Sequence, residues 1–336
     1  MKKIWHFVSA FLITSVLLSS CQMKKEATMK FHTVKLRFAE NHVGTTPAAL
    51  ADKEFARLVE EKTAGRVRIE VVTGGALTET SAEAIEALKN GDIAFTRISS
   101  TPLATYVPKI NAIQLPYLYR SSSHMWNVLN GKVGQEILGD VEKAGVGLVG
   151  LCYYDAGSRN FYSTKEIRSV SDMKDLRVRV QGGLMNDMCK ALGAVPVTGI
   201  EMSLVRENIE SGNIDAAENN WPTYQSTGDY TVAKYFVLDQ HTRVPEIVIA
   251  SKKVLSSLPS DDVKAIEEAA KLTQEFEIAK WKEMEASAER IVRANGNMII
   301  DLPSRSLEEF QNAMQPVYDK YASNFGYILR EIQNTK

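Results

Sequence analysis

Two side chains suited to anion binding follow short apolar runs in the middle of the chain. Arg179 stands at the end of the run at residues 176–181, and Asn219 stands in the loop after a second run. A helical pattern between such runs predicts a βαβ unit. Ligands of open α/β sheets bind just beyond strand ends, where the planar fork of an arginine matches a carboxylate. The pattern therefore predicts an anion site, most simply for a small organic acid.

The composition is that of a globular protein without a general affinity for nucleic acid. The chain has 336 residues, of which 44% are hydrophobic and 24% charged, which is ample for two domains. Its 40 basic and 41 acidic residues give a net charge of -1. Nucleic acid is therefore not expected as a partner.

Three stretches around these side chains resemble one known family. They are residues 172–179, 191–196 and 212–219, which read DMKDLRVR, ALGAVP and GNIDAAEN. Together they resemble the substrate-binding proteins of tripartite ATP-independent periplasmic (TRAP) transporters, the DctP-like family. The resemblance covers nearly the whole chain after the leader. It implies a protein that binds a small organic acid, without a cofactor, and passes it to TRAP membrane subunits.

The first 20 residues have the pattern of a secretory signal. A basic start precedes an apolar run at residues 4–18, which is short for a transmembrane helix, and small residues then lead to Cys21. This resembles a bacterial lipobox, which implies cleavage before Cys21, a lipid on that cysteine and a tether at residues 21–30. The alternative is an uncleaved anchor helix. Either way the remainder is expected outside the cytoplasmic membrane, facing the periplasm or the cell exterior.

The other two cysteines and a glycine-rich motif are not expected to bind a metal or a cofactor. Cys152 lies in a strand-like run and Cys189 on a helix, so buried free thiols are predicted, and no metal-ligand spacing exists. Residues 145–150 fit the spacing GxGxxG, but they follow a helical run and lead into a strand. A dinucleotide site has the opposite order, so these glycines are interpreted as a helix stop and a turn.

The N-terminal part alternates between predicted strands and helices. Strands are expected at residues 31–40, 67–72 and 93–96, with helices at 46–65 and 80–89 between them. The order βαβαβ predicts a mostly parallel sheet.

Three polar side chains near these strand ends are candidates for contact with ligand hydroxyls. Arg97 follows the third strand. The sequence around it resembles family members that bind sugar acids, and this favours a contact between Arg97 and the ligand. The alternative for His42 is a surface or structural role. The alternative for Glu79 is compensation of the dipole of the helix that follows it.

Further candidates lie in the second half of the chain. The resemblance implies a second ligand-facing arginine, Arg159, whose alternative is an ion pair with a carboxylate such as Asp155. Trp221 is expected to cap a sugar ring or to make an apolar contact at the hinge. His241 is expected to bond a ligand hydroxyl or to lie in the hinge region.

The resemblance implies an α/β, two-lobed periplasmic-binding-protein-like fold with a hinge. Lobe I is expected to comprise residues 31–155 and 245–284, and lobe II residues 156–244 and 285–336. The chain is expected to cross between the lobes near residues 154–157.

A long helical pattern extends from Ser260 to about Ala294 without a persistent heptad repeat. A C-terminal helix that spans both lobes, as in the family, is therefore expected. Before it, residues 247–250 are predicted to form a strand that returns to lobe I.

These patterns together predict a monomeric binding protein for a sugar acid. Arg179 is expected to bind the carboxylate with help from Arg159 and Asn219, and hydroxyls are expected to be contacted from the other lobe by Glu79, Arg97 and His42. Residues 219–222, 234–235 and His241 resemble the uronate-binding subgroup. The expected ligands are therefore galacturonate and glucuronate, and the alternatives are diketogulonate and C4-dicarboxylates. The rival function is an exported uronate-processing enzyme, for which the sequence contains no HExxH motif, GxSxG motif or zinc spacing.

Overall fold

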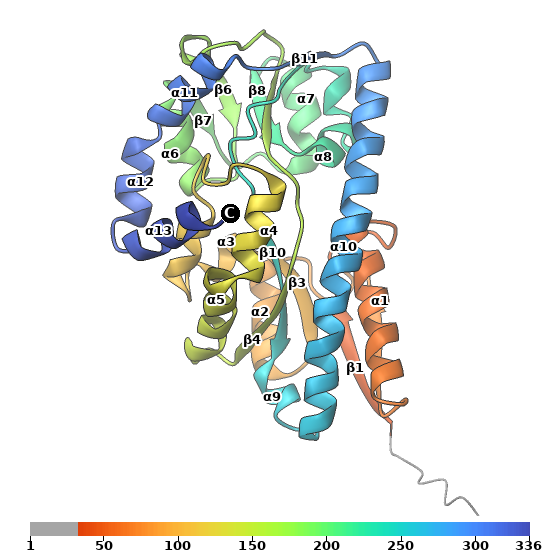
Figure 1. The fold of residues 1–336 in the computed structure, drawn as a ribbon. Coiled ribbons are helices and arrows are strands. Elements are labelled where there is room, and N and C mark those ends of the chain that lie inside the picture. Colours follow the sequence, from red (N-terminus) through yellow and green to blue (C-terminus); the bar gives the residue numbers. More distant parts are fainter. Residues whose placement is uncertain (1–32) are drawn as a thin grey trace, which may run out of the picture. The chain divides into compact units, whose positions relative to one another are not determined.

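The computed structural model describes residues 33–336, which form an α/β structure built on two sheets (Figure 1). The expected signal segment at residues 1–20, the tether at 21–30 and the lipid site at Cys21 lie outside the described residues. Within the described part of the chain, no helix combines the length and the hydropathy that a membrane span requires.

The first sheet has five strands in the order β2-β1-β3-β10-β4. Their bounds are β1 Val34–Ala39, β2 Val67–Val72, β3 Phe95–Ser99, β4 Leu148–Tyr154 and β10 Glu246–Ser251. Strand β1 runs parallel to β2 and β3, as the βαβαβ pattern predicts, whereas β10 runs antiparallel to β3 and β4. The reversal arises because the chain re-enters this sheet from the other lobe, at the edge where β1 and β3 end.

Helices and apolar clusters cover both faces of the first sheet. The helices are α1 Pro47–Lys62, α2 Ser81–Asn90, α3 Ser100–Leu103, α4 Ser122–Asn130, α5 Lys132–Lys143 and α9 Lys252–Leu255, with a 3-10 turn at Pro108–Ile113. Two of them begin at the predicted caps. The Thr46 side chain accepts from the Ala49 amide before Pro47, and Thr80 forms a capping box with Glu83.

The second sheet has six strands in the order β11-β9-β5-β8-β6-β7. Their bounds are β5 Asn160–Ser163, β6 Arg177–Arg179, β7 Val195–Val197, β8 Ala216–Asn219, β9 Tyr235–Val237 and β11 Met298–Ile300. Strand β6 lies parallel between β7 and β8, which confirms the predicted βαβ unit. Strand β5 is antiparallel to β8 and β9, because it carries the chain away from the first sheet.

The second sheet is also covered on both faces. Its helices are α6 Leu184–Ala191, α7 Val205–Glu210, α8 Trp221–Ser226, α11 Ser304–Asn312 and α12 Gln315–Ala322, with 3-10 turns at Val170–Met173, Met202–Leu204 and Asp229–Thr231. The glycines at residues 145–150 follow helix α5 and lead into β4, so their interpretation as a helix stop and a turn is confirmed.

Helix α10, Ser260–Ala294, contributes to the cores of both lobes (Figure 1). Ile266 and Ala269 are buried in the apolar cluster of the first sheet. Ala288 and Val292 are buried in a cluster of the second sheet. The predicted helix across both lobes is therefore confirmed.

The C-terminal helix α13, Gly326–Asn334, differs from the sequence prediction, which assigned residues 285–336 to lobe II. Ile328 and Ile332 are fully buried in a cluster of the first sheet. The ring of His124 on α4 contacts the Ile332 carbonyl at 2.9 Å. The apolar face of α13 thus packs on lobe I, whereas α11 and α12 pack on lobe II.

Gly157 lies in the segment between β4 and β5 and packs closely against helix α10. Its φ of +66° lies in the left-handed region that favours glycine. A Cβ atom at this position would lie 2.8 Å from Nε1 of Trp281 and 3.0 Å from a carboxylate oxygen of Glu285. Only glycine therefore allows this close approach of the crossing segment to the helix.

We expect Gly157→Ala to destabilise the protein by about 2–4 kcal/mol, through backbone strain and displacement of Trp281. Thermal unfolding measures the effect, which corresponds to several degrees in the midpoint. Gly145→Ala is the matched control, because Gly145 has a φ of +72° but no atom near its Cβ position. Equal losses in the two variants would show that the contact with Trp281 contributes nothing.

Candidate ligand-binding site

A cavity of about 720 Å³ lies between the two sheets, where the carboxyl ends of β1, β3, β6 and β8 meet. Its lobe I wall comprises Asn41, His42, Arg97, Gln114 and Glu246, and its lobe II wall comprises Arg159, Gln181, Asn219 and Thr223. Helix α10 adds Trp281 and Met284. The volume is that of a site for one small molecule, and the position follows the strand-end rule for α/β sheets.

Four of the sequence-predicted residues line this cavity. They come from both lobes and are His42, Arg97, Arg159 and Asn219. Because they are brought together from segments far apart in the sequence, a ligand that contacts all four would bridge the lobes.

Arg159 is held by a buried carboxylate at the base of the lobe II wall. Its guanidinium forms an ion pair with Glu218 through Nε and Nη2, and Nη2 also donates to the Glu218 carbonyl at 3.0 Å. Nη1 donates to Oδ1 of Asn219 at 3.2 Å. The alternative expected from sequence, an ion pair with a carboxylate, is therefore present, but the partner is Glu218 rather than Asp155. The two cavity residues Arg159 and Asn219 are thus fixed relative to each other.

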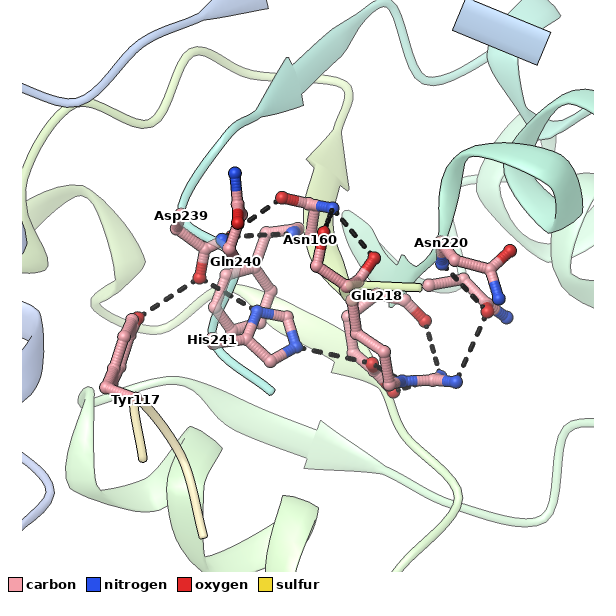
Figure 2. A network of polar contacts seen from close by, with 11 residues as sticks. Tyr117, Asn160, Glu218, Asn220, Asp239, Gln240 and His241 are labelled. Atoms are coloured by element: carbon pink, nitrogen blue, oxygen red, sulfur yellow. Dashed lines mark hydrogen bonds and ion pairs between the residues drawn. The ribbon is translucent and has the colours of Figure 1, made fainter. Parts of the chain in front are cut away.

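His241 continues this network away from the cavity (Figure 2). The side chain is fully buried, with Nδ1 at 2.8 Å from Asp239 and Nε2 at 3.4 Å from Glu218. Burial acts to lower the pKa of His241, but Asp239 and Glu218 outweigh it and raise the pKa to about 9. Burial likewise acts to raise the pKa of Glu218, but Arg159 and His241 hold it at about 2. At neutral pH the network therefore contains alternating cations and anions.

The same network ties the chain segments that connect the lobes (Figure 2). The Tyr117 hydroxyl donates to Asp239 at 3.1 Å, and the Tyr117 amide donates to the His241 carbonyl at 2.7 Å. The Gln240 amide donates to Oδ1 of Asn160 at 3.1 Å. His241 therefore lies in the hinge region, one of the two places that the sequence allowed.

On the lobe I wall, Arg97 lies between two carboxylates. It forms ion pairs with Glu40 and, at 2.8 Å, with Glu246, and Nη2 also donates to Asn41 at 2.8 Å. Burial acts to raise the pKa of Glu40, but Arg97 holds it below the usual value. Burial and the Glu40 carboxylate raise the pKa of the buried Asp52 well above its ordinary value.

Arg179 is not among the residues that line the cavity, although it lies two residues before Gln181, which does. Its side chain is 6% exposed, and Nε donates to the Ile200 carbonyl at 3.0 Å. In the parallel register Arg179 is opposite Ala217, two residues before Asn219 on β8. Its guanidinium forms no ion pair with a carboxylate among the described residues.

Two other predicted residues lie away from the cavity. Glu79 is exposed, and its amide donates to the Glu83 side chain at the start of α2. Trp221 is 5% exposed and stacks on Phe236 with ring centroids 3.9 Å apart, which corresponds to the apolar contact that the sequence left open. The tryptophan that lines the cavity is Trp281 on α10.

Sequence reasoning missed Gln114, Glu246 and Trp281. Gln114 is 4% exposed, its Oε1 accepts from Thr101 at 2.8 Å, and its Nε2 is buried without a hydrogen-bond partner. A signal for Glu246 was available, because a charged residue opens the apolar strand that returns to the first sheet. No comparable signal marks Gln114, which lies in an irregular segment.

Cys152 and Cys189 are buried and unpaired, as predicted. Burial raises the pKa of both thiols. Among residues 33–336, no group of three or more His, Cys, Asp or Glu side chains is arranged to hold a metal ion.

Comparison with known proteins assigns the chain to a family. A family model of bacterial extracellular solute-binding proteins, family 7 (DctP), matches residues 38–324. The chain belongs to this family. The resemblance seen in the sequence is thereby confirmed, and the chain is an extracytoplasmic TRAP solute-binding protein rather than an enzyme.

Individual relatives support the same conclusion. A solute-binding protein of Chromohalobacter salexigens is 32% identical over 283 residues, which are 83% of this chain and 82% of that protein. A TRAP periplasmic solute-binding protein from Pseudomonas putida F1, with bound D-glucuronate, has a TM-score of 0.83 at 29% identity and covers 90% of this chain and 98% of its own. A protein from Bradyrhizobium sp., in complex with α/β-D-galacturonate, has a TM-score of 0.81 at 35% identity, with coverage of 90% and 100%. The two-lobed fold is thereby confirmed.

The buried histidine leads to a prediction about pH. Because the pKa of His241 is raised in the folded state from 6.5 to about 9, its stabilising contribution is fully present below pH 6.5 and is lost as the pH rises through 9. We expect this group to account for about 3 kcal/mol of the fall in unfolding free energy between pH 6 and pH 10. Urea unfolding at these pH values measures it.

His241→Gln is the comparison variant and should show a shallower pH dependence. Equal pH dependence in the two proteins would contradict the assignment. If the variant fails to fold, NMR of the histidine-labelled natural protein serves instead, and one imidazole should titrate near pH 9.

Proposed function

We propose that this protein captures a hexuronate such as galacturonate or glucuronate and delivers it to TRAP membrane subunits. The observation that carries the proposal is a cavity lined by Arg159 and Asn219 from one lobe and by polar side chains from the other. Support comes from two structural neighbours, which hold D-glucuronate and galacturonate.

The carboxylate of the ligand is proposed to bind at the lobe II wall. Arg159 already forms an ion pair with Glu218, so Arg179 is the cation without a carboxylate partner in the described second lobe near the cavity. A poorly hydrated guanidinium with no carboxylate within ion-pair distance favours the entry of an anion, although Arg179 also acts electrostatically on the buried Asp229. Arg179 shares the face of the sheet with Ala217 and with Asn219, which lines the cavity. Arg159 and Asn219 supply further donors.

The hydroxyl-bearing end of the ligand is proposed to face the lobe I wall, where His42 and Arg97 lie. Partial desolvation and Arg97 lower the pKa of His42, so its half-exposed imidazole is neutral at pH 7 and offers a donor or an acceptor. The apolar face of the sugar ring would lie against Trp281. Contacts from both lobes would then stabilise the closed arrangement.

The lipid anchor belongs to the same proposal. A lipid on Cys21 and a short tether at residues 22–30 would keep the binding domain close to the membrane that holds the permease. Metabolic labelling with a fatty-acid analogue should mark the natural chain and should not mark Cys21→Ser.

We expect thermal unfolding of residues 22–336 to distinguish the ligands. At about 100 times its dissociation constant a uronate should add about 2.7 kcal/mol of stability, because it binds only the folded state. That corresponds to a shift of several degrees. Succinate should give a much smaller shift, and a shift with succinate alone would overturn the choice of ligand.

We expect Arg179→Ala to remove the uronate-induced shift while the protein remains folded. The loss of a charge-assisted contact to a carboxylate should weaken binding by at least about tenfold. Arg177→Ala is the matched control, because Arg177 lies two residues earlier on β6 and is paired with Asp215 at 2.9 Å. Undiminished binding by Arg179→Ala would contradict the role of this arginine.

A further inference from the structure

Glu246 brings a carboxylate to the cavity from the first residue of β10. Its side chain is 15% exposed, and Oε1 accepts from Nη1 of Arg97 at 2.8 Å. Oε2 has no hydrogen-bond partner within residues 33–336. One oxygen of this carboxylate is therefore held by the protein, and the other is free to accept a hydrogen bond from a ligand.

The surroundings of Glu246 contain more anions than cations. Arg97 is the cation in contact with it, and Glu40 shares the same arginine. Asp155 adds a further negative charge nearby, which Arg243 partly offsets. Burial and the neighbouring carboxylates raise the pKa of Glu246, and Arg97 opposes this rise. The side chain of the neighbouring His42 is 44% exposed, and partial desolvation and Arg97 lower its pKa to about 4, so the imidazole is neutral at pH 7. The lobe I wall therefore has a negative excess beside the cavity.

The lobe II wall has the opposite excess. Arg159 and His241 are balanced by Glu218 and Asp239, whereas Arg179 has no carboxylate within ion-pair distance in the described structure. The charge of Arg179 acts on the buried Asp229, but burial raises the pKa of that carboxyl. A ligand between the walls therefore meets a positive side and a negative side.

A hydrogen-bond donor lies on the lobe I wall as well. Nε2 of Gln114 is buried without a partner, although its Oε1 is bonded to Thr101. A buried amide donor without a partner is costly, so a ligand oxygen would satisfy it. A hydroxyl can donate to Glu246 and accept from Gln114, whereas a carboxylate can only accept.

From these observations we propose that Glu246, with Gln114, restricts the ligand to acids that carry one carboxylate and end in hydroxyls. The class excluded comprises the aldaric acids, in which the far end of the same sugar is oxidised to a second carboxylate, and the C4-dicarboxylates. This inference rests on the proposed function and adds the residue that sets the charge class of the ligand.

The exclusion follows from charge and donor count together. A second carboxylate at the lobe I wall would lie beside Glu246 and would have no proton to donate to Oε2. Repulsion between like charges in such a partly buried site is sufficient for a difference of roughly 10- to 100-fold in affinity.

The test is calorimetric titration of the purified protein with galacturonate and with galactarate, its two-carboxylate counterpart, at pH 7.5. The natural protein should bind galacturonate at least about tenfold more tightly. Glu246→Gln should lower this ratio by about tenfold or more, chiefly through tighter binding of galactarate. Glu246→Asp keeps the charge and should keep the exclusion. Glu79→Gln is the matched control, since Glu79 is an exposed carboxylate of the same lobe outside the cavity.

The outcomes separate this inference from the proposed function. Equal affinities for galacturonate and galactarate in the natural protein, or an unchanged ratio in Glu246→Gln, would overturn the inference and leave uronate binding intact. Binding of galactarate or succinate without any uronate binding would overturn the proposed function and the inference together.

Discussion

The site depends on one buried chain of charges, in which Arg159, Glu218, His241 and Asp239 alternate in sign. Buried ions are tolerated in a protein when each is paired and hydrogen-bonded, and removal of one member leaves its partner uncompensated. This chain holds Arg159 at the cavity, and through Tyr117 it also holds a loop of lobe I against lobe II. The geometry of the ligand site and that of the hinge are therefore set by the same interactions.

The two walls of the cavity have opposite unbalanced charge, and this gives closure a physical cause. Without a ligand, approach of the walls would enclose Glu246 with one carboxylate oxygen unpaired, while the already buried Arg179 would still have no carboxylate within ion-pair distance. A ligand with an anionic end and a hydroxyl end compensates both sides only when both lobes contact it. A ligand can shift a conformational equilibrium only by such differential contacts, so polarity within the cavity links recognition to lobe closure.

The sequence predicted the local structure better than the cavity. Helix starts at Thr46 and Thr80 and the βαβ unit around Arg179 follow from short-range rules, and the structure confirms them. Glu246 and Arg97 lie 149 residues apart, and no periodic pattern reports their contact. The sequence does not distinguish Trp221 from Trp281 as a candidate for the cavity, because only tertiary packing decides which of the two lines it. Helix α13 was assigned to the wrong lobe because an amphipathic helix does not specify which core it covers.

Helix α10 has a mechanical consequence because its two ends belong to different cores. Ile266 and Ala269 are fixed to lobe I and Ala288 and Val292 to lobe II, so any separation of the lobes must bend or shear the segment between them. An unbroken helix resists bending, and the work stored in it acts as an elastic restoring force. Trp281 lies within this segment. The part of the helix that deforms most is thus also the part that touches the ligand cavity.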